Sequence, residues 1–70
     1  MKYKHIAQII QSYEKHCLNE LIIINWLRKQ EIKFDFEYCY DVEATDEFRI
    51  TDKYYFENEE DLNLFKLTWL

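Results

Sequence analysis

Between residues 32 and 42 the chain alternates strictly between apolar and polar side chains. Successive side chains of a β-strand point to opposite faces, so this alternation predicts a long, half-buried strand with one aromatic face. The residues of that face are Ile32, Phe34, Phe36, Tyr38, Tyr40 and Val42. Two amphipathic helices without another packing surface would have to cover it, so we predict that the aromatic face forms the core.

A second alternating segment begins at Phe48, after a polar turn at residues 43–46. If Tyr40 pairs with Ile50, opposite charges face each other at two positions of the ladder, and each such pair contributes roughly 0.2–1 kcal/mol. The two charge pairs are Asp41 with Arg49 and Glu37 with Lys53. We therefore predict an antiparallel hairpin in this register.

The end of the second strand allows two interpretations. Tyr54 and Phe56 keep the phase of Phe48 and Ile50, which indicates a strand that continues past an irregularity at Asp52. If residues 51–53 instead form a tight turn, the hairpin becomes a three-stranded meander.

Residues 3–29 carry apolar side chains at helical spacing, and nothing among them breaks a helix. Arg28 and Lys29 would lie in the last turn, where they suit the negative end of the helix dipole. The stripe consists of Tyr3, Ile6, Ile10, Tyr13, Cys17, Leu21 and Ile24. We predict one long N-terminal helix. A short strand at residues 22–24 is the alternative, because three β-branched residues follow one another there.

A short C-terminal helix is predicted after Asn58, which is a favoured N-cap residue. Three acids follow it, where they suit the positive helix end, and Leu62, Phe65 and Trp69 then recur at helical spacing. Both helices are expected on the aromatic face of the sheet. Residues 1–70 are thus predicted to form one α+β domain, a two-layer sandwich with a long N-terminal helix, a hairpin of two or three strands and a short C-terminal helix.

The composition bears on the stability, the connections and the cellular location expected for this fold. A chain of 70 residues buries only about 60% of its unfolded surface, and its heavy load of Trp, Tyr and Phe partly offsets this limit. The chain has no Gly or Pro, so few and simple connections are expected. Cys17 and Cys39 are predicted on opposite sides of the sheet, too far apart for a disulfide. A reduced, cytoplasmic protein without a membrane span is expected, because no apolar run approaches ~20 residues.

The net charge of −5 is distributed unevenly along the chain. Residues 1–30 carry an excess of basic side chains, whereas residues 31–61 are strongly acidic. Direct binding to nucleic acid is therefore disfavoured, since phosphate contacts need clustered Lys and Arg. The outward sheet face is predicted to bind a partner protein, as an acidic patch that resembles a nucleic-acid backbone. Its residues are Asp35, Glu37, Asp41, Glu43 and Tyr55.

No catalytic, cofactor-binding or metal-binding motif occurs in the sequence. The only soft metal ligands are His5, His16, Cys17 and Cys39. His16 and Cys17 diverge by about 100° around a helix, so they cannot share a tetrahedral site. We expect both histidines on the protein surface, and neither an enzyme nor a resident cofactor or metal.

The first predicted helix is apolar nearly all round in its second half, which is more than a two-layer domain can bury. Small domains often gain stability by association, so this surplus predicts a homodimer or higher oligomer. The predicted interface residues are Leu18, Ile22, Ile23 and Trp26.

Residues 54–69 resemble the C-terminal segment of small, uncharacterised accessory proteins of tailed bacteriophages. In both, a strand ending in aromatic residues meets an acidic helix start, followed by Phe65-Lys66-Leu67 and a terminal aromatic residue, here Trp69. The resemblance implies a virus-encoded accessory protein. Together with the acidic sheet it predicts a non-enzymatic module that docks on a host protein, such as a nucleic-acid-binding one, and inhibits or redirects it. A homo-oligomeric structural protein is the alternative.

Overall fold

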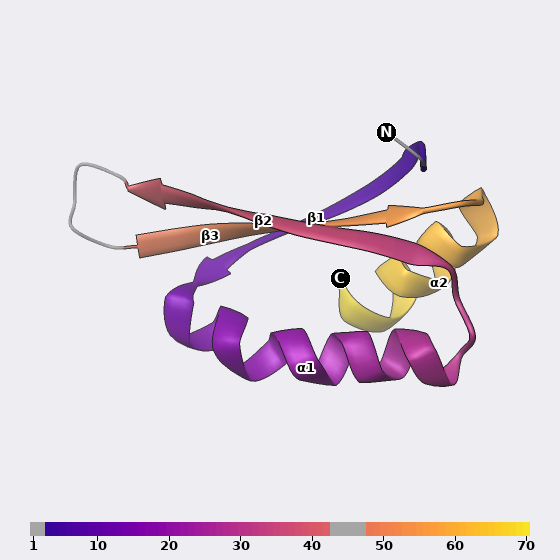
Figure 1. The fold of residues 1–70 in the computed structure, drawn as a ribbon, viewed down its shortest axis with the longest axis horizontal. Coiled ribbons are helices and arrows are strands. Elements are labelled where there is room, and N and C mark those ends of the chain that lie inside the picture. Colours follow the sequence, from indigo (N-terminus) through magenta and orange to yellow (C-terminus); the bar gives the residue numbers. More distant parts are fainter. Residues whose placement is uncertain (1–2, 43–47) are drawn as a thin grey trace.

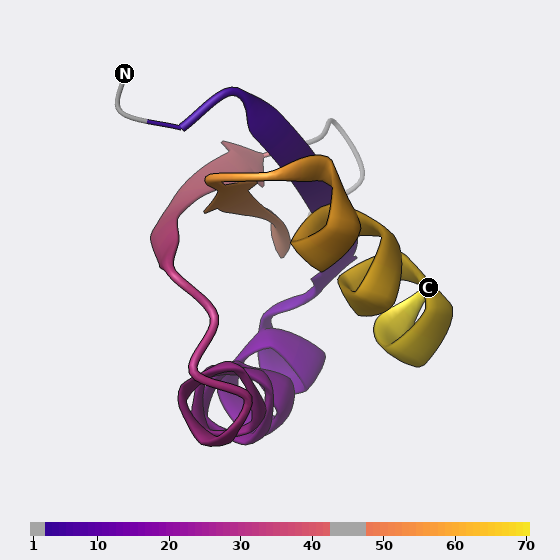
Figure 2. The ribbon, with the colours of Figure 1, turned by 90° about the vertical axis from the view of Figure 1, so that its right-hand side faces the viewer.

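In a computed structural model, three antiparallel strands form one sheet, and two helices pack on the same face of it (Figure 1). The structure describes residues 3–42 and 48–70. The elements are β1 (His5–Ser12), α1 (Tyr13–Lys29), β2 (Phe34–Val42), β3 (Phe48–Phe56) and α2 (Glu59–Trp69). The predicted α+β class is confirmed, and so is the placement of both helices on the aromatic face (Figure 2).

The predicted N-terminal helix is wrong in its first part, because residues 5–12 form the strand β1. The apolar residues Ile6, Ala7, Ile9 and Ile10 fit helical spacing and do not alternate, but the segment pairs along its length with the second edge of β3. Ser12 then starts α1 by accepting a hydrogen bond from the backbone N–H of Lys15 at 3.4 Å. The alternative strand at residues 22–24 is also wrong, since these residues lie within α1.

The sheet order is β1-β3-β2, so the last strand in sequence lies in the middle. The predicted hairpin register is confirmed: Tyr40 pairs with Ile50, and Glu37 lies opposite Lys53. β3 runs without a break through residues 51–53, so the turn considered there does not form. β1 and β2 both run antiparallel to β3, and α1 connects them in a split β-α-β arrangement. The predicted polar turn at residues 43–46 lies outside the described residues.

The connection from α1 to β2 turns sharply without glycine. Glu31 adopts a φ of 57°, in the left-handed region. The N–H of Ile32 donates to the carbonyl of Leu27, and the N–H of Glu31 donates to that of Arg28, both at 3.1 Å. This is the Schellman pattern, in which glycine is usual at the position of Glu31. Ile32 and Leu27 meet in the core and hold the turn in place.

The core lies between the sheet and the two helices, and aromatic rings fill its centre. Tyr54 contacts Phe65 of α2, with ring centroids 4.9 Å apart, and Phe36 of β2, at 4.8 Å. α1 contributes Ile23 and Leu27 to the same cluster. α2 begins as predicted, with the Asn58 side chain accepting the backbone N–H of Asp61 at 2.9 Å.

The helices do not cover the whole aromatic face. Both pack against β1 and β3, whereas the edge strand β2 reaches the core through Phe34 and Phe36. Further along β2, Tyr38 and Tyr40 remain 45% and 55% exposed. The prediction that this face is entirely core is therefore wrong at these two positions. Among residues 3–42 and 48–70, neither helix has the length and hydropathy needed to cross a bilayer.

Candidate partner-binding surface

A fully buried carboxylate lies beneath the uncovered part of β2. Asp52 is 0% exposed and points to the helix side of the central strand, in phase with Ile50 and Tyr54. It lies directly across from Tyr38 on β2 and from Ile9 on β1. The predicted irregularity at Asp52 is thus a regular strand position that carries a charge into the core. A buried charge is costly unless it is paired, so its partners decide whether this position is tolerated.

His16 of α1 is the main partner of Asp52. Its Nδ1 lies 2.7 Å from Oδ1 of Asp52, off the direction of a regular hydrogen bond. Its Nε2 lies 3.3 Å from Oε2 of Glu20, one helical turn further along α1. Each ring nitrogen of His16 thus faces a carboxylate oxygen, one from β3 and one from its own helix. The prediction of a surface histidine is wrong for His16, which is 4% exposed.

Two amides complete this group, which we call the Asp52 network: Gln11, His16, Asn19, Glu20 and Asp52. Gln11 Nε2 donates to Oδ2 of Asp52 at 2.6 Å, and Asn19 Nδ2 donates to Oε1 of Gln11 at 3.2 Å. The network therefore ties the end of β1 and the first half of α1 to the central strand. Both ring nitrogens of His16 face carboxylates, and its contact with Asp52 connects α1 to β3. We therefore assign His16 a structural role.

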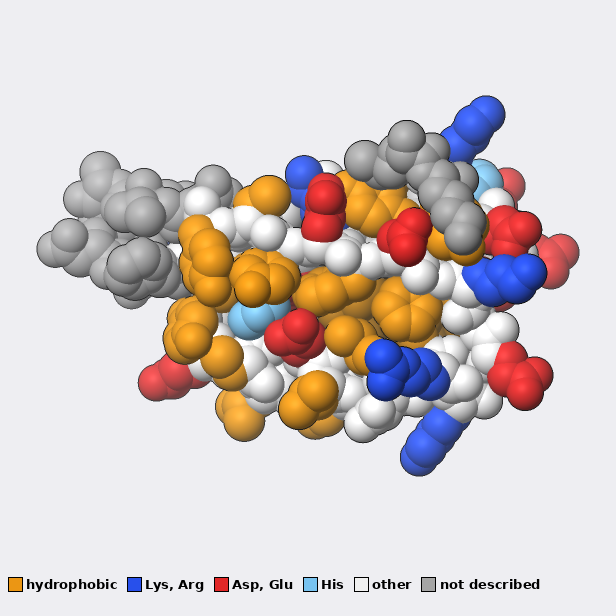
Figure 3. Space-filling model, viewed as in Figure 1, with side chains coloured by type: hydrophobic (Ala, Val, Ile, Leu, Met, Phe, Trp, Pro, Cys, Tyr) orange, Lys and Arg blue, Asp and Glu red, His pale blue; other side chains and the backbone are white. Residues whose placement is uncertain are grey.

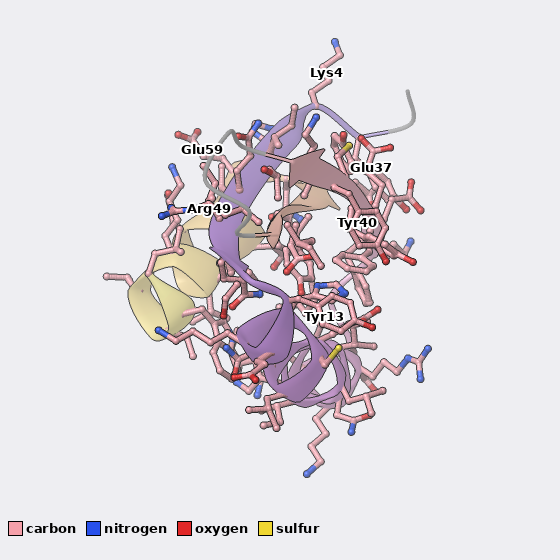
Figure 4. All side chains as sticks on the ribbon, turned by 90° about the vertical axis from the view of Figure 1, so that its left-hand side faces the viewer. Lys4, Tyr13, Glu37, Tyr40, Arg49 and Glu59 are labelled. Carbon is pink, nitrogen blue, oxygen red and sulfur yellow. The ribbon has the colours of Figure 1, made fainter. Side chains whose placement is uncertain are left out.

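Three tyrosines surround the outer end of the Asp52 network, and we call Tyr13, Tyr38 and Tyr40 the tyrosine rim. The rings of Tyr38 and Tyr40 meet edge to face, with centroids 5.5 Å apart at 84°. Tyr38 also lies over His16 at 5.0 Å. Tyr13 comes from the start of α1, and Figure 4 shows it on the same side of the molecule as Tyr40. The rim thus joins β2 to α1 around the buried histidine.

Neighbouring groups raise the pKa values of Tyr13 and Tyr40 in the tyrosine rim. A hydrogen bond with the Cys17 thiol raises the pKa of Tyr13. Partial burial raises the pKa of Tyr40, and the neighbouring Tyr38 raises it further. Beneath the rim, burial and the charges of Asp52 and Glu20 raise the pKa of Tyr54 far above 10.0. The hydroxyls of Tyr13, Tyr40 and Tyr54 therefore stay neutral at physiological pH.

The view of the space-filling surface agrees with this description. Hydrophobic side chains gather between β2 and α1, with a histidine and an acidic side chain among them at the end where α1 starts (Figure 3). Most basic side chains coloured in this view lie toward the other end of the molecule, and one lies above the hydrophobic group. The chain thus presents an aromatic surface with an acidic floor.

The outward sheet face carries only part of the predicted acidic patch. Asp35 and Glu37 are exposed there as predicted. Tyr55 lies on this face but is only 4% exposed, and its hydroxyl donates to Oε1 of Glu37. This hydrogen bond raises the pKa of Tyr55 to about 12. The side chain of Asp41 and all of Glu43 lie outside the part of the chain that the structure describes.

Lys53 lies directly across from Glu37, as the predicted register requires. Lys53 offsets part of the negative charge on this face, and the hydroxyl of Tyr55 donates a hydrogen bond to one carboxylate oxygen of Glu37. The outward face is therefore less acidic than the sequence alone indicates.

The predicted oligomer interface residues fall into three environments. Leu18 and Ile22 point away from the core and are 70% and 55% exposed. Ile23 is 3% exposed within the core, so its prediction as an interface residue is wrong. Trp26 is half-buried and meets Trp69 of α2 edge to face at 5.8 Å. Both cysteines are free and exposed, as expected from their predicted separation.

Sequence reasoning missed the Asp52 network and the tyrosine rim. A signal for the network was present, since Asp52 keeps the phase of the aromatic face and a core-phase acid requires a buried partner. His16, on the same predicted helix, could have supplied that partner. The sequence gives no comparable indication that the tyrosine rim is exposed, because Tyr38 and Tyr40 continue the alternating pattern of Phe34 and Phe36.

A shallow hollow of about 660 Å³ lies at the junction of β1 and α1, lined by residues 10–15 and Arg49. Its lining is mixed in charge and contains no buried titratable side chain. Within the described residues, no three His, Cys, Asp or Glu side chains are grouped as metal ligands. The tyrosine rim with the Asp52 network below it is therefore the stronger candidate site.

Comparison with protein-family models, with curated proteins and with solved structures found no match. The functional argument consequently depends on the geometry and charge of this chain, and the bacteriophage resemblance of residues 54–69 stays a prediction.

Proposed function

We propose that this chain is a non-enzymatic protein-binding module that docks on a positively charged partner protein through the tyrosine rim. The exposure of Tyr38 and Tyr40 on the helix-covered face of the sheet carries the proposal. Tyrosine is enriched at protein interfaces because its ring supplies contact area and its hydroxyl a hydrogen bond. An aromatic surface left open by the fold is typical of an interaction site.

The charge of the chain supports a basic partner. The net charge is −5, and long-range attraction between opposite charges accelerates encounter and selects among partners. The exposed Asp35 and Glu37 would contribute to this attraction even if they do not contact the partner. Inhibition or redirection of a host nucleic-acid-binding protein in the cytoplasm, by a virus-encoded module, is the specific form that we propose from the C-terminal resemblance.

The test is affinity purification of the tagged protein from a lysate of its native host, with identification by mass spectrometry. We expect a basic protein to be retained by the wild type and lost by the variant Tyr38→Ser/Tyr40→Ser. The matched control Leu64→Ser/Leu67→Ser removes two exposed apolar side chains from α2 and should retain the partner. Circular dichroism would establish that both variants are folded.

A third variant separates the rim from the outward sheet face. Asp35→Lys/Glu37→Lys reverses two exposed charges of the predicted acidic patch, and exposed charges contribute little to stability. Loss of the partner in this variant, with retention by Tyr38→Ser/Tyr40→Ser, would contradict docking through the rim and favour the outward face.

Homo-oligomerisation through α1 is a second candidate, and a different observation favours it. Leu18, Leu21 and Ile22 lie together on the outward side of α1 and are 55–70% exposed. Light scattering over micromolar concentrations should then give the mass of a dimer or larger species. The variant Leu18→Gln/Ile22→Gln should be monomeric, whereas Ile10→Gln, at an exposed position on the outer side of β1, should still associate. A monomeric wild type would exclude this candidate.

A further inference from the structure

The charges beneath the tyrosine rim are not balanced. Asp52 and Glu20 both lie within 3.3 Å of His16, so two carboxylates share one imidazole. Even a fully protonated ring leaves one negative charge in excess. The ion pair of Lys33 with Glu57 lies elsewhere, and Gln11 and Asn19 add only neutral amides to the network. An external cation could therefore offset the excess negative charge of the network.

Glu20 is the carboxylate that an external cation could reach. Its side chain is 30% exposed, whereas that of Asp52 is 0% exposed. The hydroxyl of Tyr54 is buried next to both charges and finds no hydrogen-bond partner among the described residues. A cation that enters beside Glu20 would meet a carboxylate oxygen and this free phenol oxygen, and both can accept hydrogen bonds.

The tyrosine rim supplies the second half of a cation site. Tyr38 and Tyr40 meet edge to face, and both rings are about half exposed. Tyrosine rings carry negative potential on their faces and attract cations, arginine more often than lysine. A guanidinium group is planar, so it can stack on a ring and still donate in its own plane to a carboxylate.

We propose that Tyr38, Tyr40 and Glu20, flanked by Tyr13, form a binding site for one arginine side chain of a partner protein. This inference rests on the proposed function and specifies the chemistry of the partner. The guanidinium stacks on the tyrosine rim and pairs with Glu20, which supplies the cation that the Asp52 network lacks. A phosphate-bearing ligand is disfavoured, because the same carboxylates would repel it.

The experiment is an NMR titration of the full chain with synthetic nonapeptides of Gly and Ser that contain one central arginine. Citrulline and lysine versions serve as controls, because citrulline keeps the planar shape without the charge and lysine keeps the charge without the plane. We expect the arginine peptide to shift the resonances of Tyr13, Tyr38, Tyr40 and Glu20. We expect the citrulline peptide to cause no shift and the lysine peptide to bind more weakly.

Variants at an exposed ring keep the test independent of folding. Tyr40→Leu removes the π face from a position that is 55% exposed, and it should weaken arginine-peptide binding about tenfold. Tyr40→Phe keeps the face and should bind within about twofold of the wild type. Glu20→Gln, which keeps the shape but removes the charge, should weaken binding about fivefold to tenfold.

Several outcomes would overturn the site. These are equal binding of the citrulline or lysine peptide, shifts confined to Asp35 and Glu37 or to the acids of α2, and no shift at all. The affinity purification distinguishes this failure from failure of the proposed function. If retention of the partner requires Tyr38 and Tyr40 but the arginine peptide does not bind there, the proposed docking surface is supported and the arginine site is excluded.

Discussion

At the scale of single residues, the Asp52 network shows how one polar position in the core organises its surroundings. Asp52 is paired with His16 and accepts an amide hydrogen from Gln11, so two elements other than its own strand hold it. A buried pair of this kind is often no more stable than an apolar pair of similar volume, but removal of one partner is strongly destabilising. The network thus contributes more to the specificity of the fold than to its net stability.

A double-mutant cycle tests this interpretation. Asp52→Leu alone leaves the buried Nδ1 of His16 and the side-chain amide of Gln11 without the carboxylate that they face, and it should lower the free energy of unfolding by about 1–3 kcal/mol. Asp52→Leu with His16→Leu removes both partners, so we expect it to be more stable than the single variant. The control Asp35→Leu, at an exposed strand position, should change stability by no more than about 0.5 kcal/mol. Urea unfolding followed by circular dichroism measures all three, and equal costs at positions 35 and 52 would contradict the pairing.

The hydrogen bond between Tyr55 and Glu37 predicts a pH dependence at the alkaline end. The pKa of Tyr55 rises from 10.0 to about 12 in the folded chain. Below pH 10 the phenol is protonated in both states, whereas above it the unfolded chain releases the proton first. The stabilisation is therefore lost as the pH rises from 10 to 12. Tyr55→Phe should lose less stability than the wild type across this window, as measured by the urea midpoint. Parallel curves for the two proteins would exclude this role of Tyr55.

At the scale of elements, the chain forms its turns without glycine, and this places a residue with a Cβ in a strained backbone conformation. Glu31 ends α1 in a left-handed conformation, with φ at 57°, which disfavours residues that carry a Cβ. The hydrophobic contact of Ile32 with Leu27 holds it there. The end of α1 at Lys29 and the start of α2 at Asn58 were predictable, because caps and terminal charges are local signals.

A glycine substitution tests the strain at the end of α1. Glu31→Gly should raise the free energy of unfolding by up to about 1 kcal/mol, because the left-handed strain exceeds the entropy that glycine adds to the unfolded chain. Lys29→Gly is the matched control two residues earlier, inside the last helical turn, where it should cost about 1 kcal/mol. Chemical unfolding gives both values. A loss of stability in Glu31→Gly would show that the turn is not strained.

The start of the chain shows why an element can be mispredicted. The apolar residues among residues 5–12 lie in the adjacent pairs Ile6–Ala7 and Ile9–Ile10, a spacing that favours a helix, yet the segment forms a strand. The choice depends on the second edge of β3, which lies more than 35 residues away in sequence and pairs with β1 along its length. Without that pairing, the hairpin would be a two-stranded sheet with two open edges.

At the scale of the whole molecule, the helices cover the sheet unequally. α1 and α2 lie on one side of the sheet (Figure 2), both against β1 and β3, and Tyr38 and Tyr40 toward the far end of β2 remain about half exposed. The same asymmetry that provides the candidate binding surface also leaves Tyr38 and Tyr40 of β2 only partly buried. The proposed function thus depends on the helices leaving this part of β2 uncovered.

Hydrogen exchange of the native chain tests this asymmetry. The backbone N–H groups of the central strand β3 should exchange most slowly, because β3 is paired on both edges. Hydrogen-bonded N–H groups of β1, against which both helices pack, should exchange more slowly than those of β2 around Tyr38. The reverse order for β1 and β2 would contradict the helix placement.

The sequence by itself determined what depends on neighbours along the chain: the alternation of β2, the hairpin register with its charge pairs, the end of α1, the N-cap of α2 and the aromatic character of one sheet face. These follow from backbone periodicity and from contacts over a few residues or across one turn. Only the tertiary structure decided that residues 5–12 pair with β3, that Asp52 and His16 are buried together, and that Tyr38 and Tyr40 stay exposed. The strand phase of Asp52 was a local signal of its burial, but its pairing with His16 and the other two features depend on which distant surfaces meet once the helices have packed.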